Sequence, residues 1–592
     1  TATTELSASN GTISNWLDDN NISTATVNEA ITGGEAIIKG NFDQDSASTL
    51  ANQINSGSLP FALSAESYST ISPSLGAKSL DVMVQAGIIA FILVAILMIV
   101  RYRLPGTIAV ISLMGQAAAT LAVVSGYFTV FPGSTLTLPG IAGIILGIGM
   151  GVDANVITAE RIKEELSKNK TLEGAVNSGF KMGLTPIIDG NVTIVIVAAI
   201  LMGAFGPTDG FWAKVFNPIF YWFGPSTAGT IYSFGFTLLT SVLLNFVFGV
   251  WATRVMIRGA VHFKPLRKAW LIGGKKEGGA AFKPPSLNYI GNRKKFSPFS
   301  RALIAVVLVF CGIFGVKMDV EFKGGSMITL AYEGDADLND LKSTIGTELG
   351  KSNLTLQTGS DISGNQTLTV TLPGSDTLTT EQLDNLLAAL NEQYPDNKFV
   401  QNEVSNVDAT IGKEFLLKSV VALVAACVLI LLYVAYRFRK IGGLKAGSTA
   451  IVALLHDMFV VFGVFVLLRI PLNGNFIAAL LTILGYSIND TVVIYDRIRE
   501  NSALYGKKQM SLAELVNLSV NQSFARSLMT SITTCLALGV VCVVSVIYSL
   551  DRIYSFAIPL LFGMVSGVYS TICIATPLWV DWKNKKKAAK KA

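Results

Sequence analysis

The 592-residue chain has few of the side chains that build metal centres or disulfide frameworks. It contains only two histidines, His262 and His456, and five cysteines, all of which lie in apolar stretches without metal-ligand spacing. These counts exclude a histidine-based metal site and a disulfide-stabilised secreted domain, and they indicate that the cysteines are packing residues. The sequence therefore predicts neither a metal nor a bound organic cofactor.

Charged residues are also scarce. They make up 15% of the chain, whereas 51% of the residues are hydrophobic, and the mean hydropathy is +0.52. This composition excludes an ordinary soluble protein and favours a polytopic α-helical membrane protein with water-facing domains. Acidic and basic residues gather in different segments, so the net charge of +6 does not indicate a nucleic-acid partner.

Eleven apolar segments approach the ~20 residues that a helix needs to cross a bilayer. Five lie in a first half, 80–256, and six in a second half that includes 301–317 and 411–582, with a basic linker, 257–300, between the halves. The segments are 80–101, 105–130, 138–159, 182–205, 227–256, 301–317, 412–437, 446–468, 475–497, 521–546 and 552–580.

The basic flanks of these segments alternate along the chain. Because basic loops stay on the cytoplasmic side, residues 257–300 and the Lys-rich tail 583–592 are expected to be cytoplasmic. The segments 1–79 and 318–410 then lie outside the membrane, and the aromatic loop 206–226 lies at the outer interface. The positive-inside rule alone accounts for the basic linker; the alternative is that the linker contacts lipid headgroups or nucleic acid.

The two external segments have α+β patterns. Residues 1–79 resemble the C-terminal part of a domain, with strands at 26–31, 36–41 and 61–70 and a helix at 46–56. Residues 318–410 follow the order strand 320–332, helix 337–349, strands 353–358 and 366–372, helix 379–393 and strand 398–405, which is the ferredoxin-like βαββαβ pattern. Since the chain starts at Thr1 and shows no signal peptide, we interpret it as lacking its original N-terminus.

Two similar stretches place carboxylates at membrane depth. Gly485–Glu500 carries Asn489 and Asp490, and Gly149–Glu164 carries Asp153 at the position that matches Asn489. An ionisable residue is costly in a membrane segment and is a functional candidate by default. We therefore predict two pseudo-symmetric halves, each with one membrane carboxylate; the alternative is a purely structural pair of hydrogen-bonding groups.

The nearest candidate cation is Arg526, in the hydroxyl-rich stretch Ser523–Thr534. We predict that it pairs with Asp490 and that binding of H⁺ or Na⁺ breaks the pair and changes helix packing; Arg526 as a simple membrane anchor is the alternative. One charge crossing the membrane gains ~2.3 kcal/mol per 100 mV, which suffices to bias a two-state core. Supporting polar candidates are Asn155, Asp189, Asn191, Asn489, His456 and Asp457; the last two form either part of a relay or a satisfied packing pair.

The motifs Leu138–Gly143, Gly149–Asn155, Glu321–Gly325 and Gly485–Asn501 resemble those of the fused SecD–SecF protein-export membrane proteins of the resistance-nodulation-division superfamily. The resemblance covers nearly all of residues 1–585. It implies twelve membrane helices in two sixes, five plus six of them visible here and the twelfth before Thr1, and two external domains.

The resemblance also implies a function. The family assists the SecYEG channel and the SecA motor in late steps of preprotein export, at the outer face of the bacterial cytoplasmic membrane. It uses the proton-motive force or, in some members, sodium. Its membrane carboxylates match Asp153 and Asp490, and its membrane arginine matches Arg526; Gly151 departs slightly from the family motif. Membrane lipids are further expected partners.

Three other classes remain open. A small-molecule or lipid exporter of the same superfamily is disfavoured because residues 318–410 form a short external insertion. A non-energised scaffold of the channel predicts that Asp490→Asn has no effect on secretion. An intramembrane aspartyl protease is disfavoured because Tyr495-Asp496 sits at the interface beside Arg497, so we predict that the chain is not an enzyme.

Overall fold

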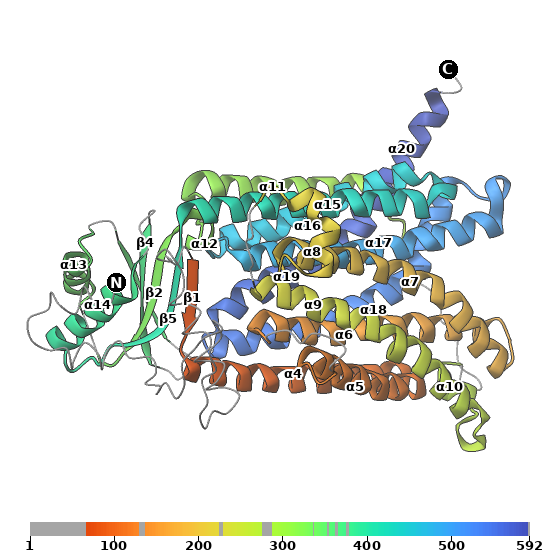
Figure 1. The fold of residues 1–592 in the computed structure, drawn as a ribbon. Coiled ribbons are helices and arrows are strands. Elements are labelled where there is room, and N and C mark those ends of the chain that lie inside the picture. Colours follow the sequence, from red (N-terminus) through yellow and green to blue (C-terminus); the bar gives the residue numbers. More distant parts are fainter. Residues whose placement is uncertain are drawn as a thin grey trace, which may run out of the picture. The chain divides into compact units, whose positions relative to one another are not determined.

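The computed structural model describes residues 67–128, 136–223, 229–274, 287–334, 337–351, 354–360, 365–373 and 378–589. The strands predicted at 26–31 and 36–41 and the helix predicted at 46–56 lie outside these described residues. Figure 1 shows a bundle of long helices with a small β-sheet at one end. We call that end of the bundle the sheet end and the opposite end the linker end.

Eleven helices in the described part of the chain are long and apolar enough to cross a membrane, which confirms the predicted fold class. They are α4 (Pro73–Tyr102), α5 (Leu104–Val124), α6 (Leu138–Ser167), α7 (Leu172–Phe205), α9 (Gly229–Asn245) continued by α10 (Thr253–His262), α11 (Arg293–Phe314), α15 (Ala409–Arg437), α16 (Gly443–Leu467), α17 (Gly474–Gln509), α18 (Leu512–Ile547), and α19 (Asp551–Ser570) continued by α20 (Thr576–Ala589).

The last membrane helix of each half is interrupted by a π-helical turn. These turns are η1 (Phe246–Ala252) and η5 (Thr571–Ala575). Periodicity of apolar residues does not reveal such turns, because they leave the apolar run intact. The aromatic loop predicted at the interface contains one further helix, α8 (Phe211–Phe220), followed by the exposed Trp222.

The sheet confirms the ferredoxin-like pattern of the second half. Its strands β5 (Val400–Val407), β2 (Gly325–Tyr332), β4 (Gln366–Pro373) and β3 (Thr355–Ser360) lie in that order and are antiparallel. Two helices, α13 (Leu338–Glu348) and α14 (Thr380–Gln393), connect them in the βαββαβ order.

A fifth strand comes from the first half of the chain. β1 (Ser67–Ile71) pairs antiparallel with β5, from Ser67 opposite Val407 to Ile71 opposite Glu403. The sequence predicts a strand here but not its partner. Because β1 leads directly into α4, the sheet is tied to the membrane helices of both halves.

The strand predicted at 320–332 is shorter than expected, because its first residues form the helical turn α12 (Val320–Lys323). Asp319 caps this turn by accepting a hydrogen bond from the Glu321 amide. Gly324 ends it with a φ of 77°, and a Cβ there would lie 2.3 Å from the Cα of Ala409. The close approach of α15 to this turn therefore requires glycine.

The helices α6 and α17 form the centre of the bundle. Their most apolar stretches are 94% and 89% buried, whereas that of α11 is 11% buried and forms part of the periphery. Both central helices carry the polar stretches singled out in the sequence. The fold thus surrounds the candidate carboxylates with protein instead of exposing them to lipid.

Candidate functional site

The membrane site is centred on Asp153 of α6. One carboxylate oxygen, Oδ2, accepts a hydrogen bond of 2.9 Å from the Asn489 amide of α17. The other, Oδ1, accepts one of 3.0 Å from the Thr530 hydroxyl of α18 and lies 3.9 Å from Nη2 of Arg526. Side chains from one helix of the first half and two helices of the second half therefore meet at a single carboxylate.

The predicted pairing of Arg526 with Asp490 is wrong in its partner. In the described chain the ion pair of Arg526 is with Asp153. Successive helical residues are turned by about 100°, so Asn489 faces Asp153 whereas Asp490 faces Ser527 and Ser531 of α18. Both carboxylates nevertheless approach the same face of α18.

This cluster contains two carboxylates and one guanidinium at membrane depth. Asp490 lies sixteen residues from the start of α17 at Gly474, and seven residues before Arg497, which corresponds to ~24 Å and ~10 Å along the helix. One proton or one monovalent cation would leave such a cluster electrically neutral. The arrangement therefore suits reversible binding of a small cation.

A glycine of α7 positions the Asn489 amide. A Cβ placed on Gly190 would lie 1.8 Å from Oδ1 of Asn489, so a larger residue there would force the Asn489 side chain to move. Thr193, one turn further along α7, lies 3.4 Å from the carbonyl of Gly485. The packing of α7 against α17 thus holds the amide toward Asp153.

The other candidates of the first half lie elsewhere. Asn155 donates to the Gly151 carbonyl of its own helix, and the structure gives no contact of Asn191 with Asp153. Asp189 does not join Asp153 either: it accepts a hydrogen bond of 2.7 Å from Nε of Arg437 on α15. The sequence could not indicate this pairing because the two residues are 248 positions apart.

His456 and Asp457 lie next to each other on α16, with Nδ1 of His456 3.3 Å from Oδ1 of Asp457. Asp457 is fully buried and accepts hydrogen bonds of 2.6 Å from Ser487 of α17 and from Ser570 of α19. A third hydroxyl, from Ser566, also reaches it. With its oxygens bound to hydroxyls of α17 and α19, this carboxylate fits the packing alternative better than a relay. Among the described residues, the buried Nε2 of His456 has no hydrogen-bond partner.

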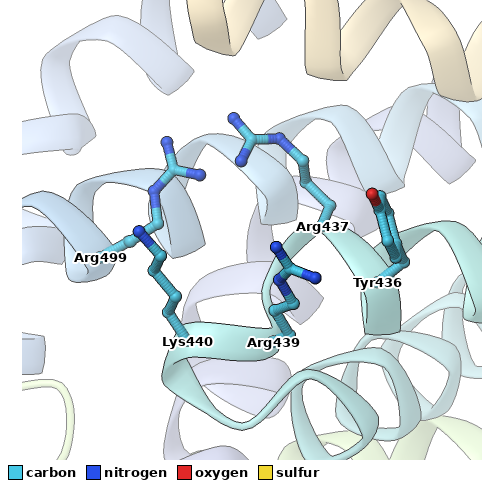
Figure 2. Close-up of a pocket in the computed structure, with 5 residues that line it drawn as sticks. All are labelled: Tyr436, Arg437, Arg439, Lys440 and Arg499. Carbon is cyan, nitrogen blue, oxygen red and sulfur yellow. The ribbon is translucent and has the colours of Figure 1, made fainter.

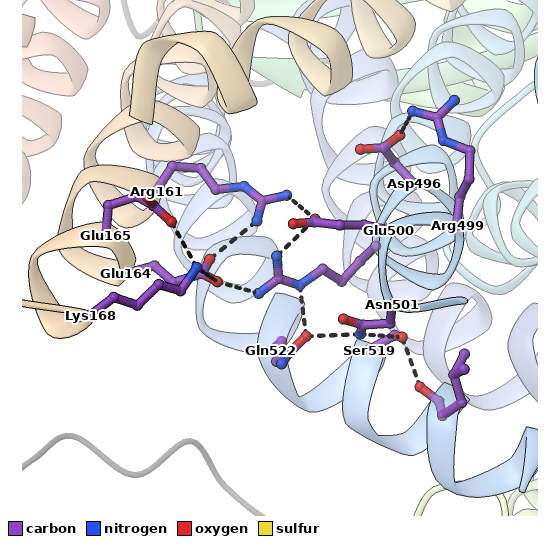
Figure 3. A network of polar contacts seen from close by, with 12 residues as sticks. Arg161, Glu164, Glu165, Lys168, Asp496, Arg499, Glu500, Asn501, Ser519 and Gln522 are labelled. Atoms are coloured by element: carbon purple, nitrogen blue, oxygen red, sulfur yellow. Dashed lines mark hydrogen bonds and ion pairs between the residues drawn. The ribbon is translucent and has the colours of Figure 1, made fainter. Parts of the chain in front are cut away.

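At the linker end, four charged residues link the two halves. Arg161 lies 3.1 Å from Glu164 and 2.9 Å from Glu500, and Arg497 lies 2.9 Å from each of the same two glutamates. Figure 3 shows the contacts of Arg161 with Glu164 and Glu500. We call these four residues the charge ring.

The charge ring is pseudo-symmetric. Arg161 and Glu164 occupy the same places in their stretch as Arg497 and Glu500 do in theirs, and each arginine contacts the glutamates of both halves. From the sequence, Asp496 and Arg497 are expected at the membrane interface, but their partners are not predicted. A signal was present, since both stretches carry Arg and Glu three residues apart, but their mutual contact depends on the packing of α6 against α17.

At the sheet end, α17 contacts the external domain. The backbone amide of Gly474, the first residue of α17, donates a hydrogen bond of 2.6 Å to Glu321. Arg552, near the start of α19, forms an ion pair with Glu403 of β5. The helix that carries Asn489 and Asp490 therefore touches the sheet domain at one end and the charge ring at the other.

Comparisons with known proteins agree with this architecture. The family profile "Protein export membrane protein SecD/SecF, C-terminal" matches residues 53–213 and 387–585, and the profile "SecDF, P1 head subdomain" matches residues 2–61. The SecDF protein translocase subunit of Bacillus subtilis is 31% identical over 579 residues, which is 95% of this chain and 72% of that protein.

A second relative, the SecDF protein translocase subunit of Thermus thermophilus, is 32% identical over 577 residues, or 97% of this chain and 71% of that protein. A crystal structure of SecDF from Thermus, described as a translocon-associated membrane protein, superposes with a TM-score of 0.71 at 30% identity. That match covers 94% of this chain and 70% of the solved one. A SecDF structure in a super-membrane-facing form superposes with a TM-score of 0.64.

Proposed function

Because the chain belongs to the SecD/SecF family of protein-export membrane proteins, we propose that it couples a transmembrane proton gradient to late steps of preprotein export. The observation that carries this proposal is the cluster of Asp153, Asp490 and Arg526 between the two halves. In the proposed setting the sheet domain lies outside the bacterial cytoplasmic membrane and holds the preprotein, while the linker and C-terminus face the cytoplasm. The SecYEG channel and the SecA motor are the proposed partners, and the chain performs no covalent catalysis.

Proton binding would act through the contacts of Asp153. The carboxylate accepts from Asn489 and Thr530 and attracts Arg526. A proton on it removes the attraction for the guanidinium and turns one acceptor oxygen into a donor. The contact between α6 and α18 then loses its charge pair, so a different packing of these helices becomes favourable.

The available energy is sufficient for such a shift. One charge crossing a potential of about 100 mV releases ~2.3 kcal/mol, which changes a two-state population ratio about fifty-fold. The helix α17 provides the path to the outside, since it runs from Asn489 and Asp490 to the contact between Gly474 and Glu321. A movement of α17 would therefore be transmitted to the sheet domain.

The proposal can be tested by following late translocation of a preprotein from membrane vesicles that contain the full chain, with the H⁺ and Na⁺ gradients collapsed separately. We expect collapse of the H⁺ gradient to remove the stimulation and collapse of the Na⁺ gradient to leave it intact. The opposite result would assign sodium as the coupling ion. Stimulation that survives both treatments would establish the scaffold alternative.

The junction between Glu321 and α17 should respond to pH. Burial and the nearby charge of Asp319 raise the pKa of Glu321 above its ordinary value. A carboxyl with a raised pKa holds its proton more tightly in the docked state, so docking is most stable below the ordinary pKa and weakens as pH rises through the raised one. We expect amide exchange at Gly474 to be faster at about pH 8 than at about pH 5 after correction for the intrinsic exchange rate.

The variant Glu321→Gln should remove most of this pH dependence. Asp408 provides a control because its pKa is shifted in the opposite direction. It caps α15, and the hydrogen bond from the Thr410 amide lowers its pKa. The ionised Asp408 contributes to stability at neutral pH, and this contribution is lost as pH falls through the lowered pKa. Because Asp408 titrates in the opposite direction from Glu321, Asp408→Asn should leave the response at Gly474 unchanged. An unaltered pH response in Glu321→Gln would contradict the assignment.

A further inference from the structure

A cationic pocket opens at the linker end of α15. It has a volume of about 310 Å³ and is lined by Tyr436, Arg437, Arg439, Lys440 and Arg499. Figure 2 shows the three guanidinium groups and the lysine around one open space, with the Tyr436 ring at its side. Four of the five lining residues are cations and none is acidic, so the pocket is suited to an anion.

Two of these cations are already paired within the protein. Arg437 lies 2.7 Å from Asp189, and Arg499 forms an ion pair with Asp496. Within the described ranges, neither Arg439 nor Lys440 has an ion pair, and the guanidinium of Arg439 lies over the Tyr436 ring at 5.4 Å. Both side chains are exposed, so their charges are available to a ligand.

The first half of the chain contains a similar arginine pair in which both members have partners, since Arg101 lies 3.4 Å from Glu160. Its counterpart of Arg437-Phe438-Arg439 is Arg101-Tyr102-Arg103, which likewise lies at the end of a long membrane helix, α4. There, Arg103 donates a hydrogen bond of 2.6 Å to the Trp270 carbonyl and lies over its ring at 5.2 Å. The linker thus supplies the partner of Arg103, whereas its counterpart Arg439 has no ion pair within the described ranges.

The open pocket continues a lipid-facing apolar surface. Six side chains on one face of α15 are exposed, and the last of them, Tyr436, lines the pocket. They follow one another at intervals of three or four residues: Leu417, Val420, Val424, Val428, Leu432 and Tyr436. A ligand with an anionic head in the pocket could lay an acyl chain along this face.

From these features we infer that the pocket binds the phosphate of an anionic phospholipid, with Arg439 and Lys440 donating to the phosphate oxygens and the acyl chain lying along α15. An arginine beside a lysine provides a planar two-donor group and a point charge, and both bind phosphate well. Arg437 connects this pocket to Asp189 of α7, the helix whose Gly190 lies against the Asn489 side chain. The pocket is therefore joined through Arg437 to α7, which packs against the helix that carries Asn489 and Asp490.

The inference can be tested by titrating the purified full chain in detergent with dihexanoyl-phosphatidylglycerol, dihexanoyl-phosphatidylcholine and inorganic phosphate while binding is followed by calorimetry. We expect the phosphatidylglycerol to bind more tightly than the other two. The double variant Arg439→Gln/Lys440→Gln should weaken its binding about tenfold or more, since each basic residue near a lipid surface contributes roughly a factor of five.

The matched control is Arg103→Gln: this arginine already donates to the Trp270 carbonyl, so its replacement should not alter phosphatidylglycerol binding. Unchanged affinity in the double variant would overturn the inference. Equal affinity for inorganic phosphate would overturn the assignment to a lipid and leave a free-phosphate site. If the double variant does not fold, Lys440→Gln decides the matter, because an unchanged affinity there would also overturn the inference.

Discussion

Replacement of Asp153 by asparagine should abolish gradient-dependent preprotein export. The substitution keeps the size of the side chain but removes the charge that faces Arg526 at 3.9 Å and the group that can bind a proton. It also leaves a guanidinium that is only 11% exposed without its ion pair. Losing one partner of a buried pair costs about 3 kcal/mol or more, so the expected effect on coupling is close to complete.

The measurement is late translocation from vesicles with and without an imposed proton gradient. The matched control is Glu165→Gln, which changes another buried carboxylate of α6, twelve residues further along, whose partners are Lys168 and Lys170. We expect Glu165→Gln to retain stimulation by the gradient. If Asp153→Asn retained it as well, the carboxylate would not be the proton-binding group.

Two further variants separate the contributions of Asp490 and Arg526 to coupling and to stability. Asp490→Asn should also abolish coupling, yet it leaves the contact of Asp153 with Arg526 in place, so the folded chain should be nearly as stable as before. Arg526→Met removes the only cation of the cluster and should abolish coupling with a larger loss of stability. Full stimulation in all three single variants would exclude a proton-driven mechanism through this site.

Much of the fold could be predicted because each helix or strand can be recognised from its own stretch of sequence. Length and apolar content identify each membrane helix without knowledge of its neighbours, and the alternation of strands and helices in 318–410 specifies the ferredoxin-like order. The pairing of β1 with β5 could not be predicted, because it joins residues more than 330 positions apart along the chain. The turn at Val320–Lys323 was missed because its apolar and polar residues alternate like those of a strand.

The residues of the candidate site could be predicted from the sequence, but the contacts between them could not. The cost of an ionisable group in a membrane identifies Asp153, Asp490 and Arg526 from the sequence alone. Which carboxylate meets the arginine depends on the rotation of α17 against α18, and neighbouring positions on a helix differ by about 100°. The internal similarity aligned Asp153 with Asn489, and the structure shows that these two equivalent residues bind each other across the two halves.

The second large effect is expected when a residue of the charge ring is replaced, and it concerns the stability of the folded chain. The variant Arg497→Gln leaves Glu500 with Arg161 and leaves Glu164 with Arg161 and the more exposed Lys168. The Arg497 side chain is only 8% exposed. We expect a loss of about 2 kcal/mol in the free energy of unfolding, between the values for exposed and buried ion pairs. Thermal unfolding of the purified chain would show it.

A double-variant cycle distinguishes a ring from two independent pairs. In Arg497→Gln/Glu164→Gln, one arginine and one glutamate remain, Arg161 and Glu500, and they lie 2.9 Å apart. Charge balance is restored, so the double variant should be about 1 kcal/mol more stable than the sum of the single losses predicts. Strict additivity would contradict the ring.

The same variants also test whether the charge ring takes part in the proposed coupling step. Arg161 lies eight residues from Asp153, or ~12 Å along α6, so loss of the ring should leave the carboxylate contacts intact. Because the ring fastens α6 to α17 only at the linker end, its loss should let the two halves separate more easily there. We therefore expect Arg497→Gln to retain gradient-dependent export with reduced efficiency, and the double variant to recover part of that loss. Complete loss of export in a folded Arg497→Gln protein would instead place the ring within the coupling step itself.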